Sequence, residues 1–410
     1  MKALSGLSTQ VKQYLIITGN YWAFTLTDGA LRMLVVLYFH QLGYSPLNIA
    51  LLFVFYEIFG VVTNLVGGWL GARLGLNKTI NIGLALQVVA LAMLLVPSNL
   101  LTVFYVMAAQ ALSGVAKDLN KMSAKSAIKL LVSADESHKL YHWVALLTGS
   151  KNTLKGIGFF LGGLMLTWLG FTGAIAVMVI MLIIVWLFSM VKLQADLGKA
   201  QNKPKFKDIF SKSKAINLLS AARLFLFAAR DVWFVIALPV FLAAEFSWSH
   251  SWVSGFIAAW IVLYGLMQTL APKLTEKPSG QAPNSKDAAM WGAILVIVPL
   301  AMALFLYNDV TAQWVIIIGL IAFALLFAIN SSLHSFLIVD MADKDGVSLD
   351  VGFYYMANAC GRLLGTVLSG WVFQAYGLVA CLYISAIFIA FAVIFVALIN
   401  PIKNHTPERI

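Results

Sequence analysis

The sequence predicts an all-α membrane protein with twelve transmembrane helices in two six-helix, pseudo-symmetric bundles that work by alternating access. Three observations lead to this fold class. The 410 residues are 61% hydrophobic and only 11% charged, whereas soluble domains contain about 25% charged residues. Twelve apolar stretches are long enough to cross a bilayer, which takes about 20 residues each. Two of these stretches repeat one pattern of glycines and cations at a constant offset.

The apolar stretches follow one another along the whole chain with short connections between most of them. Charges and glycine-rich patches make the fourth, fifth and eleventh stretches the least regular. The predicted spans are 14–38, 46–71, 79–96, 100–124, 141–168, 172–191, 215–243, 251–271, 288–307, 312–338, 351–376 and 378–399.

Cations are distributed unevenly among the connections. The odd-numbered connections, such as HQLGYS, GFTG, EFSWSHS and YG, contain no Lys or Arg. The even-numbered ones contain Arg73, Lys78, Lys129, Lys139, Lys199, Lys203, Lys205, Lys207, Lys212, Lys214, Lys273, Lys277, Lys286 and Lys344. Because cytoplasmic loops are enriched in cations, we expect the even connections and both termini to be cytoplasmic in a multi-pass plasma membrane protein. An odd number of helices would break this alternation.

A basic polar stretch lies at the midpoint of the chain. It divides the sequence into an N-terminal bundle (1–191), a cytoplasmic linker (192–214) and a C-terminal bundle with a cytoplasmic tail (215–410). A central linker between two six-helix halves is typical of transporters built from parallel repeats. The alternative is a plain cytoplasmic loop.

An internal repeat supports the two halves. At an offset of 207 residues, a cation and three glycines of one apolar stretch match those of another, and Asp28 and Asp231 match more loosely. The matching pairs are Lys155 with Arg362, Gly158 with Gly365, Gly163 with Gly370, and Gly170 with Gly377. We therefore expect Lys155 and Arg362 to face each other near the midplane, across a pseudo-two-fold axis.

Charged residues inside the apolar stretches indicate a functional interior. Eight are cations and four are acids: Arg32, Lys117, Lys121, Lys151, Lys155, Arg223, Arg230 and Arg362, against Asp28, Glu57, Asp118 and Asp231. Charges in the hydrocarbon core cost several kcal/mol, so they face partners or a water-filled cavity and usually mark a pathway. The excess of cations predicts that the species bound or moved is an anion.

Arginine binds phosphate-like groups through a planar fork with two donors, whereas lysine acts as a point charge. We therefore expect Arg32, Arg230 and Arg362 to clamp the anion, with Lys155 as a point charge. Lys117, Lys151 and Arg223 are further candidates for substrate binding. The alternative is structural ion pairing between helices.

Two acids lie close to these arginines in sequence. Asp28 and Arg32 are one helical turn apart and able to pair. Arg230 and Asp231 are adjacent, about 100° apart around a helix. For them we expect partners on other helices.

Lys117, Lys121 and Lys125 recur at every fourth position, which places them in one stripe on a helix, with Asp118 beside it to neutralise part of the charge. For Lys125 the simplest interpretation is a lysine that emerges at the cytoplasmic surface.

Five residues are candidates for ion pairing or for proton coupling. Glu57 and His334 are the main ones, because a desolvated carboxyl or an imidazole titrates near neutral pH. Asp28, Asp118 and Asp231 complete the group. The alternative for each is a hydrogen-bonded structural role.

The segment GGWLGARLGLNK resembles the loop between helices 2 and 3 of the major facilitator superfamily. The matching residues are Gly68, Leu70, Arg73, Gly75 and Lys78. The resemblance implies that Gly68, Arg73, Gly75 and Lys78 form a conformational loop. Ala72 stands where that family usually has Asp, and Gln110 stands where many proton-coupled members have Arg.

Longer segments are similar to the organoarsenical efflux permeases (ArsJ type) of that superfamily. They include YWAFTLTDGALRMLVVLYFHQLGYSP, QALSGVAKDLNKMSAKSA and LTGSKNTLKGIGFFLGG. The resemblance implies efflux of 1-arseno-3-phosphoglycerate and arsenate resistance, in a bacterial inner membrane. It also implies a functional partnership with a glyceraldehyde-3-phosphate dehydrogenase, which makes the substrate, without direct contact.

Other function classes find little support. The chain lacks GxxxxGK[ST], which argues against an ATP-driven pump. The His residues are scattered apart from one local cluster, HKLYH, so we expect no enzyme, no metal site and no cofactor. Two cysteines without a CxxC pair argue against a thiolate site. We expect a monomer that binds a small anion and lipid but no nucleic acid.

The substrate and the energy coupling stay open at this point. A related fold could carry another organophosphate or organic anion, with or without protons. Export of a multiply charged anion from a cell that is negative inside releases about 2.3 kcal/mol per charge per 100 mV, which favours uniport driven by the membrane potential.

Overall fold

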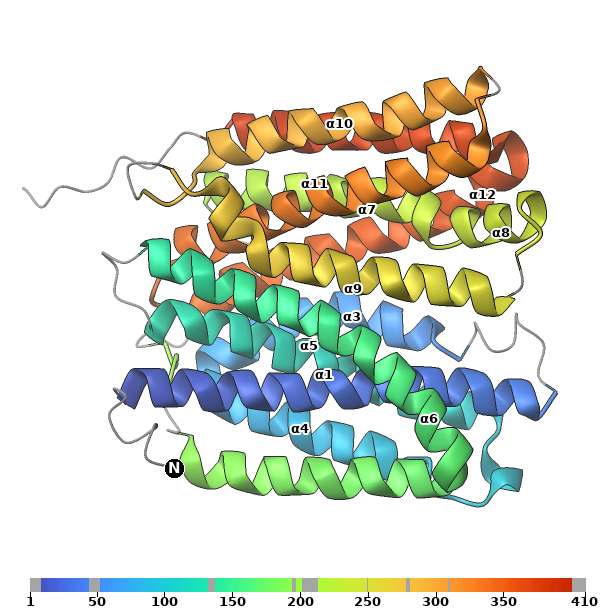
Figure 1. Ribbon diagram of the computed structural model, residues 1–410. Helices are drawn as coiled ribbons and strands as arrows, with labels where there is room; N and C mark the ends of the chain where they lie inside the picture. The colour runs from blue at the N-terminus through green and yellow to red at the C-terminus, as the bar shows by residue number, and fades with distance from the viewer. Residues whose placement is uncertain are drawn as a thin grey trace, which may run out of the picture.

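The computed structural model describes residues 9–43, 52–131, 137–193, 197–200, 213–248, 250–277, 281–308 and 310–399. In these ranges all the regular elements are helices, and most run alongside one another as long rods (Figure 1). The helices from the first half of the sequence lie in the lower part of the view and those from the second half in the upper part.

The helices match the predicted spans closely. The first half contains α1 (Thr9–Gln41), α3 (Val54–Leu74), α4 (Leu76–Met93), the 3-10 turn η2 (Ser98–Leu100), α5 (Val103–Leu131) and α6 (Ser137–Lys192). The second half contains α7 (Lys214–Phe234), α8 (Ala237–Glu245), α9 (His250–Thr275), α10 (Ser285–Tyr307), α11 (Ala312–Met341) and α12 (Val347–Ala397).

Two very long helices each hold two membrane spans. Within the described ranges, eight helical segments are long and apolar enough to cross a membrane, and α6 and α12 are among them. Non-helical backbone interrupts α6 at Gly170 (φ 67°) and α12 at Gly377 (φ 76°). Glycine reaches positive φ at little cost because it lacks Cβ. The connections predicted at GFTG and YG are thus single-residue kinks, and they lie at matching positions of the repeat.

The seventh span is interrupted, contrary to the continuous stretch predicted over 215–243. It divides into α7 and α8, and Pro239 lies in the first turn of α8. Proline has no N–H to donate to the carbonyl four residues earlier, and its ring clashes with that carbonyl. Next to the break, the Ala237 N–H donates to Ser369 Oγ of α12 at 3.1 Å instead.

The repeat also appears in the packing. A Cβ on Gly158 of α6 would lie 2.6 Å from the Leu26 carbonyl oxygen of α1. A Cβ on Gly365 of α12 would lie 2.7 Å from the Ala228 carbonyl oxygen of α7. Backbones that approach this closely need a residue without a side chain, which is the usual way for membrane helices to pack.

Contacts between the two halves of the sequence gather at one end of the molecule, which we name the joined end. Ser348 Oγ of α12 donates to the Gly68 carbonyl oxygen of α3 at 2.7 Å. Tyr141 Oη of α6 and Thr275 Oγ1 of α9 lie 2.8 Å apart. Further along α6 and α9, Asn152 Nδ2 donates to Gln268 Oε1 at 2.5 Å. The two halves therefore meet from the joined end towards the middle of the helices.

Most of the predicted linker, including residues 201–212, lies outside the described residues. Its described part contacts the connection between α3 and α4. The Ala200 N–H donates to the Ala72 carbonyl oxygen at 2.8 Å, and the Leu76 N–H donates to the Leu197 carbonyl oxygen at 2.7 Å.

Candidate functional site

A chain of ion pairs crosses between the two halves of the sequence. Glu57 of α3 accepts from Arg362 of α12 at 3.2 Å and lies 3.5 Å from Arg32 of α1. Arg362 Nε also lies 3.4 Å from Asp231 Oδ2 of α7, and Arg230 binds Oδ1 of the same carboxylate at 2.6 Å. Arg362 therefore joins α12 to both α3 and α7.

These charges are accessible although they lie far inside their helices. The side chains of Arg362 and Glu57 are 35% and 34% exposed, and that of Arg32 is 28% exposed. They point towards one another from several helices, and exposure of a charge to lipid is very costly. We therefore expect water rather than lipid around their accessible surface.

One donor in this network is unsatisfied. The contact between Arg362 Nε and Asp231 Oδ2 does not have hydrogen-bond geometry, and both atoms are buried without a hydrogen-bond partner in the described part of the chain. A buried donor that lacks an acceptor is unfavourable. Arg362 Nε therefore gains only the electrostatic attraction of Asp231, and it has no surface open to a ligand in this conformation.

Lys151 and Lys155 add positive charge that the described residues do not pair with a carboxylate. Lys155 is close enough to Arg32, Asp28, Arg362 and Lys117 to interact with them electrostatically. Its Nζ lies 5.8 Å from the centre of the Phe159 ring. The cationic ends of the repeat pair, Lys155 and Arg362, thus belong to one electrostatic cluster.

The lysine stripe of α5 forms as predicted and is partly neutralised. Asp118, with its side chain 2% exposed, lies 2.5 Å from Lys121 Nζ and 3.8 Å from Lys117 Nζ. Lys117 Nζ also lies 3.7 Å from the centre of the Tyr56 ring, and Tyr56 donates its hydroxyl hydrogen to Asp28 at 2.7 Å.

The interpretation of Lys125 as a surface lysine is wrong. Lys125 is 2% exposed, and its Nζ donates to the Tyr355 hydroxyl of α12. The end of α5 that the hydrophobic pattern places at the surface is covered by the other half of the protein. Lys125 therefore lies on the surface of the first half but is buried where the second half packs against it.

The expectations about neighbouring charges hold only in part: Asp231 has the expected partner on another helix, Arg362 of α12, but it also pairs with its neighbour. Arg230 and Asp231 do pair, at 2.6 Å, because the long arginine side chain bends across the 100° that separates them. Asp28 binds Tyr56, while Arg32 turns to Glu57. Arg32 further stacks over the Phe53 ring at 4.9 Å.

Arg223 and His334 lie apart from this network. Arg223 is 3% exposed and donates to Asn358 Oδ1 at 2.9 Å and to the Ser331 carbonyl and hydroxyl oxygens at 3.2 Å. His334 is 2% exposed, and its Nδ1 has no hydrogen-bond partner among the described residues. Both residues lie in the packed interior of the second half.

The connection between α3 and α4 lies at the joined end. Gly75 (φ 98°) separates the two helices, and Arg73 stacks over the Trp69 ring at 5.1 Å. Arg73 and Lys78 line a small pocket together with Leu74 and Lys199. Gly68 contacts Ser348, so the predicted conformational loop contacts the helix that carries Arg362.

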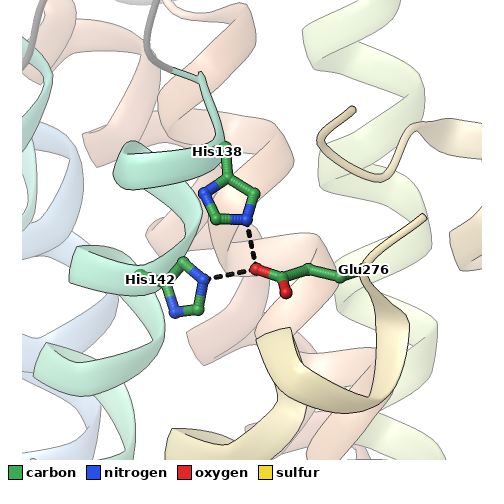
Figure 2. A group of neighbouring side chains, drawn as sticks. All are labelled: His138, His142 and Glu276. Atoms are coloured by element: carbon green, nitrogen blue, oxygen red, sulfur yellow. Dashed lines mark hydrogen bonds and ion pairs between the residues drawn. The ribbon is translucent and has the colours of Figure 1, made fainter. Parts of the chain in front are cut away.

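Sequence reasoning missed one cluster. His138 and His142 of α6 both direct Nε2 at Glu276 Oε1, just beyond the end of α9 (Figure 2). Burial acts to raise the pKa of the Glu276 carboxyl, but the hydrogen bond with His142 and the nearby His138 lower it overall. The HKLYH spacing shows the two histidines, but only the tertiary structure adds the carboxylate.

Comparisons with known proteins agree with this architecture. A family model described as Major Facilitator Superfamily matches residues 17–333 and 219–410. The fucose:proton symporter FucP of E. coli is similar, with a TM-score of 0.71 and 15% identity over 95% of this chain and 99% of that chain. The human organic anion transporter MFSD10 has a TM-score of 0.72 and 14% identity over 95% and 100%.

A third solved structure is a bacterial homologue of the iron transporter ferroportin in an outward-facing state. It has a TM-score of 0.72 and 12% identity over 95% of this chain and 99% of that chain. At identities this low, the likeness shows the fold alone. A search of the curated proteins finds no match.

Proposed function

The chain belongs to the major facilitator superfamily of membrane transporters, and we propose that the species it carries is a small organic polyanion. The observation that carries this proposal is the surplus of cations over carboxylates inside the helix bundle. Within 4 Å, Lys151 and Lys155 form no ion pair with a carboxylate in the described part of the chain, whereas the other intramembrane cations except Arg223 do. A ligand with two or more negative charges would balance these two lysines.

Three arginines would clamp the anion. Arg362 occupies the centre of the ion-pair chain, with Arg32 and Arg230 at its two ends. Their planar forks suit the paired oxygens of phosphate-like groups. Lys155, Lys151 and Lys117 would contribute point charges. We assign Arg223 to packing, because neutral groups of its own half accept from its Nε and Nη1.

Transport would require the joined end to open and close. We propose that residues 1–191 and 215–410 rock against each other as two bundles about the central site, with 192–214 as the linker. With the cation-rich connections on the cytoplasmic side, the joined end is cytoplasmic and the structure faces outward. Gly68, Arg73, Gly75 and Lys78 then belong to the cytoplasmic gate.

The finer proposal concerns the substrate. The similarity to organoarsenical efflux permeases suggests 1-arseno-3-phosphoglycerate, exported across a bacterial inner membrane. Such a molecule carries a phosphate ester at one end and an arsenate group at the other. Two tetrahedral anionic groups fit a clamp with arginines at both ends of an ion-pair chain. The alternative is another organophosphate or organic anion carried by the same fold.

Arsenate resistance tests the substrate. We expect arsenate-sensitive cells that express this protein together with a glyceraldehyde-3-phosphate dehydrogenase to grow at arsenate concentrations that stop cells with either protein alone. The reason is that the dehydrogenase must first make the exported anion. Growth curves across an arsenate series provide the measurement, with Arg362→Ala plus the dehydrogenase as the control. Arsenite resistance that does not depend on the dehydrogenase would contradict this substrate and favour the alternative.

Energy coupling has its own test. All four intramembrane acids contact a donor or cation: Asp28 with Tyr56, Glu57 with Arg32 and Arg362, Asp118 with Lys117 and Lys121, and Asp231 with Arg230 and Arg362. We propose uniport driven by the membrane potential, worth about 2.3 kcal/mol per charge per 100 mV. In proteoliposomes, an imposed potential without a pH gradient should drive the anion out. A response to the pH gradient alone, lost in Glu57→Gln, would instead identify Glu57 as a proton carrier.

A further inference from the structure

Three potential metal ligands converge at the joined end, away from the central site. His138 and His142 are four residues apart at the start of α6, so they share one helix face, with ring centres 4.7 Å apart. Glu276 approaches from the end of α9, and Figure 2 shows both imidazoles directed at its carboxylate. One ligand atom from each residue lies within 4.8 Å of the others.

The geometry points to a site for a divalent transition metal ion of the Zn²⁺ type, which would hold the joined end closed. Imidazole nitrogen and carboxylate oxygen are ligands that zinc prefers, and two histidines with one carboxylate leave a fourth position for water. Hard cations such as Ca²⁺ prefer all-oxygen sites with more ligands. The donor set therefore selects a transition metal over calcium.

The site is accessible and able to adjust. The side chains of His138 and His142 are each 40% exposed, and that of Glu276 is 31% exposed, so an ion can enter from solution. Ligand atoms 2.0–2.2 Å from a tetrahedral metal lie about 3.3–3.6 Å from one another. The three ligand atoms already lie within 4.8 Å of one another, so small side-chain rotations are enough to approach that spacing.

The location gives the metal a consequence. The histidines lie in the first half of the sequence and Glu276 in the second, next to the Tyr141–Thr275 contact that joins the halves. A transporter that alternates access must separate this end in every cycle. An ion that binds all three ligands recognises only the closed arrangement and shifts the population towards it. The metal would thus inhibit transport by holding the joined end closed, whichever substrate is carried.

Zn²⁺ titration of the purified protein, made without a polyhistidine tag, tests the site. We expect one equivalent of Zn²⁺ to bind in competition with a chromophoric chelator, and Ca²⁺ not to bind. His142→Ala and Glu276→Gln should each weaken Zn²⁺ binding by at least about tenfold, because one of three ligands is lost. His250→Ala, at the opposite end of α9, is the matched control and should bind like the unmodified protein.

Hydrogen exchange supplies a second readout that does not need the transport substrate. Zn²⁺ should slow amide exchange at residues 68–72 of α3 and 348–352 of α12, where the joined end is held by the Gly68–Ser348 contact instead of by α6 and α9. It should not slow exchange there in Glu276→Gln. Folding of each variant is checked by its thermal unfolding. Equal Zn²⁺ affinity in the unmodified protein and in Glu276→Gln, or unchanged exchange, would overturn the proposal and leave the cluster as an ion pair only. Neither result bears on the identity of the anion.

Discussion

Arg362→Ala should abolish anion transport while the protein stays folded in the membrane. Arg362 pairs with Glu57 at 3.2 Å and with Asp231 at 3.4 Å, and its Nε has no acceptor among the described residues. Loss of a hydrogen bond from a charged group costs about 1.5–3 kcal/mol, and every 1.4 kcal/mol is a factor of ten in affinity. We therefore expect substrate affinity to fall about 10–100-fold, measured by uptake of labelled anion into inverted vesicles.

Two further variants separate binding from charge balance. Arg362→Lys keeps the charge but loses the planar fork, so it should restore only part of the transport. The double variant Arg362→Ala with Glu57→Gln removes both partners of the ion pair. If Arg362 served only to neutralise Glu57, the double variant would recover transport, whereas a role in anion binding predicts that it stays inactive.

A neutral surface change serves as the matched control for Arg362. Lys286→Ala removes an exposed cation at the start of α10 and should transport the anion normally. If Arg362→Ala transported the anion as well as the unmodified protein, Arg362 would not be one of the residues that bind the anion.

Gly352→Val should prevent closure of the joined end and stop transport. A Cβ on Gly352 of α12 would lie 2.6 Å from the Asn64 carbonyl oxygen and 2.9 Å from the Gly68 Cα, both in α3. These are backbone atoms that no side-chain rotation can move, so a valine forces α3 and α12 apart. The variant would favour the state in which this end is open, and a transporter held in one state completes no cycle.

Alkylation of a cysteine at position 348 measures that change. Ser348 is fully buried between the two helices, and its hydroxyl donates to the Gly68 carbonyl oxygen at 2.7 Å. In a background without Cys360 and Cys381, Ser348→Cys should resist a water-soluble maleimide, and it should react once Gly352→Val is added. Gly19→Val is the matched control for Gly352→Val, because a Cβ on Gly19 meets nothing within 4 Å. It should leave the cysteine at position 348 unreactive. Normal transport by Gly352→Val would show that the close approach is dispensable.

The sequence alone determined the helices and their repeat. A run of about 20 apolar residues must cross the bilayer as a helix, because its backbone groups find no other partners there. Most predicted spans therefore match the helices within a few residues; the exceptions are α5, which ends at Leu131 instead of 124, and the seventh span, which divides into α7 and α8, while 46–51 lie outside the described residues. Gly170 and Gly377, matched in the repeat, both became kinks with positive φ, a conformation specified locally by the lack of a Cβ.

Only the tertiary structure decided which charges meet. Helical periodicity places a side chain on a face, but its partner depends on the rotation and depth of a neighbouring helix, which are set by packing between residues distant in the chain. Arg362 of α12 therefore reaches Glu57 of α3, and Lys125, expected at the surface, is covered by Tyr355. For the same reason the carboxylate of Glu276 joins two histidines whose spacing alone predicts no site.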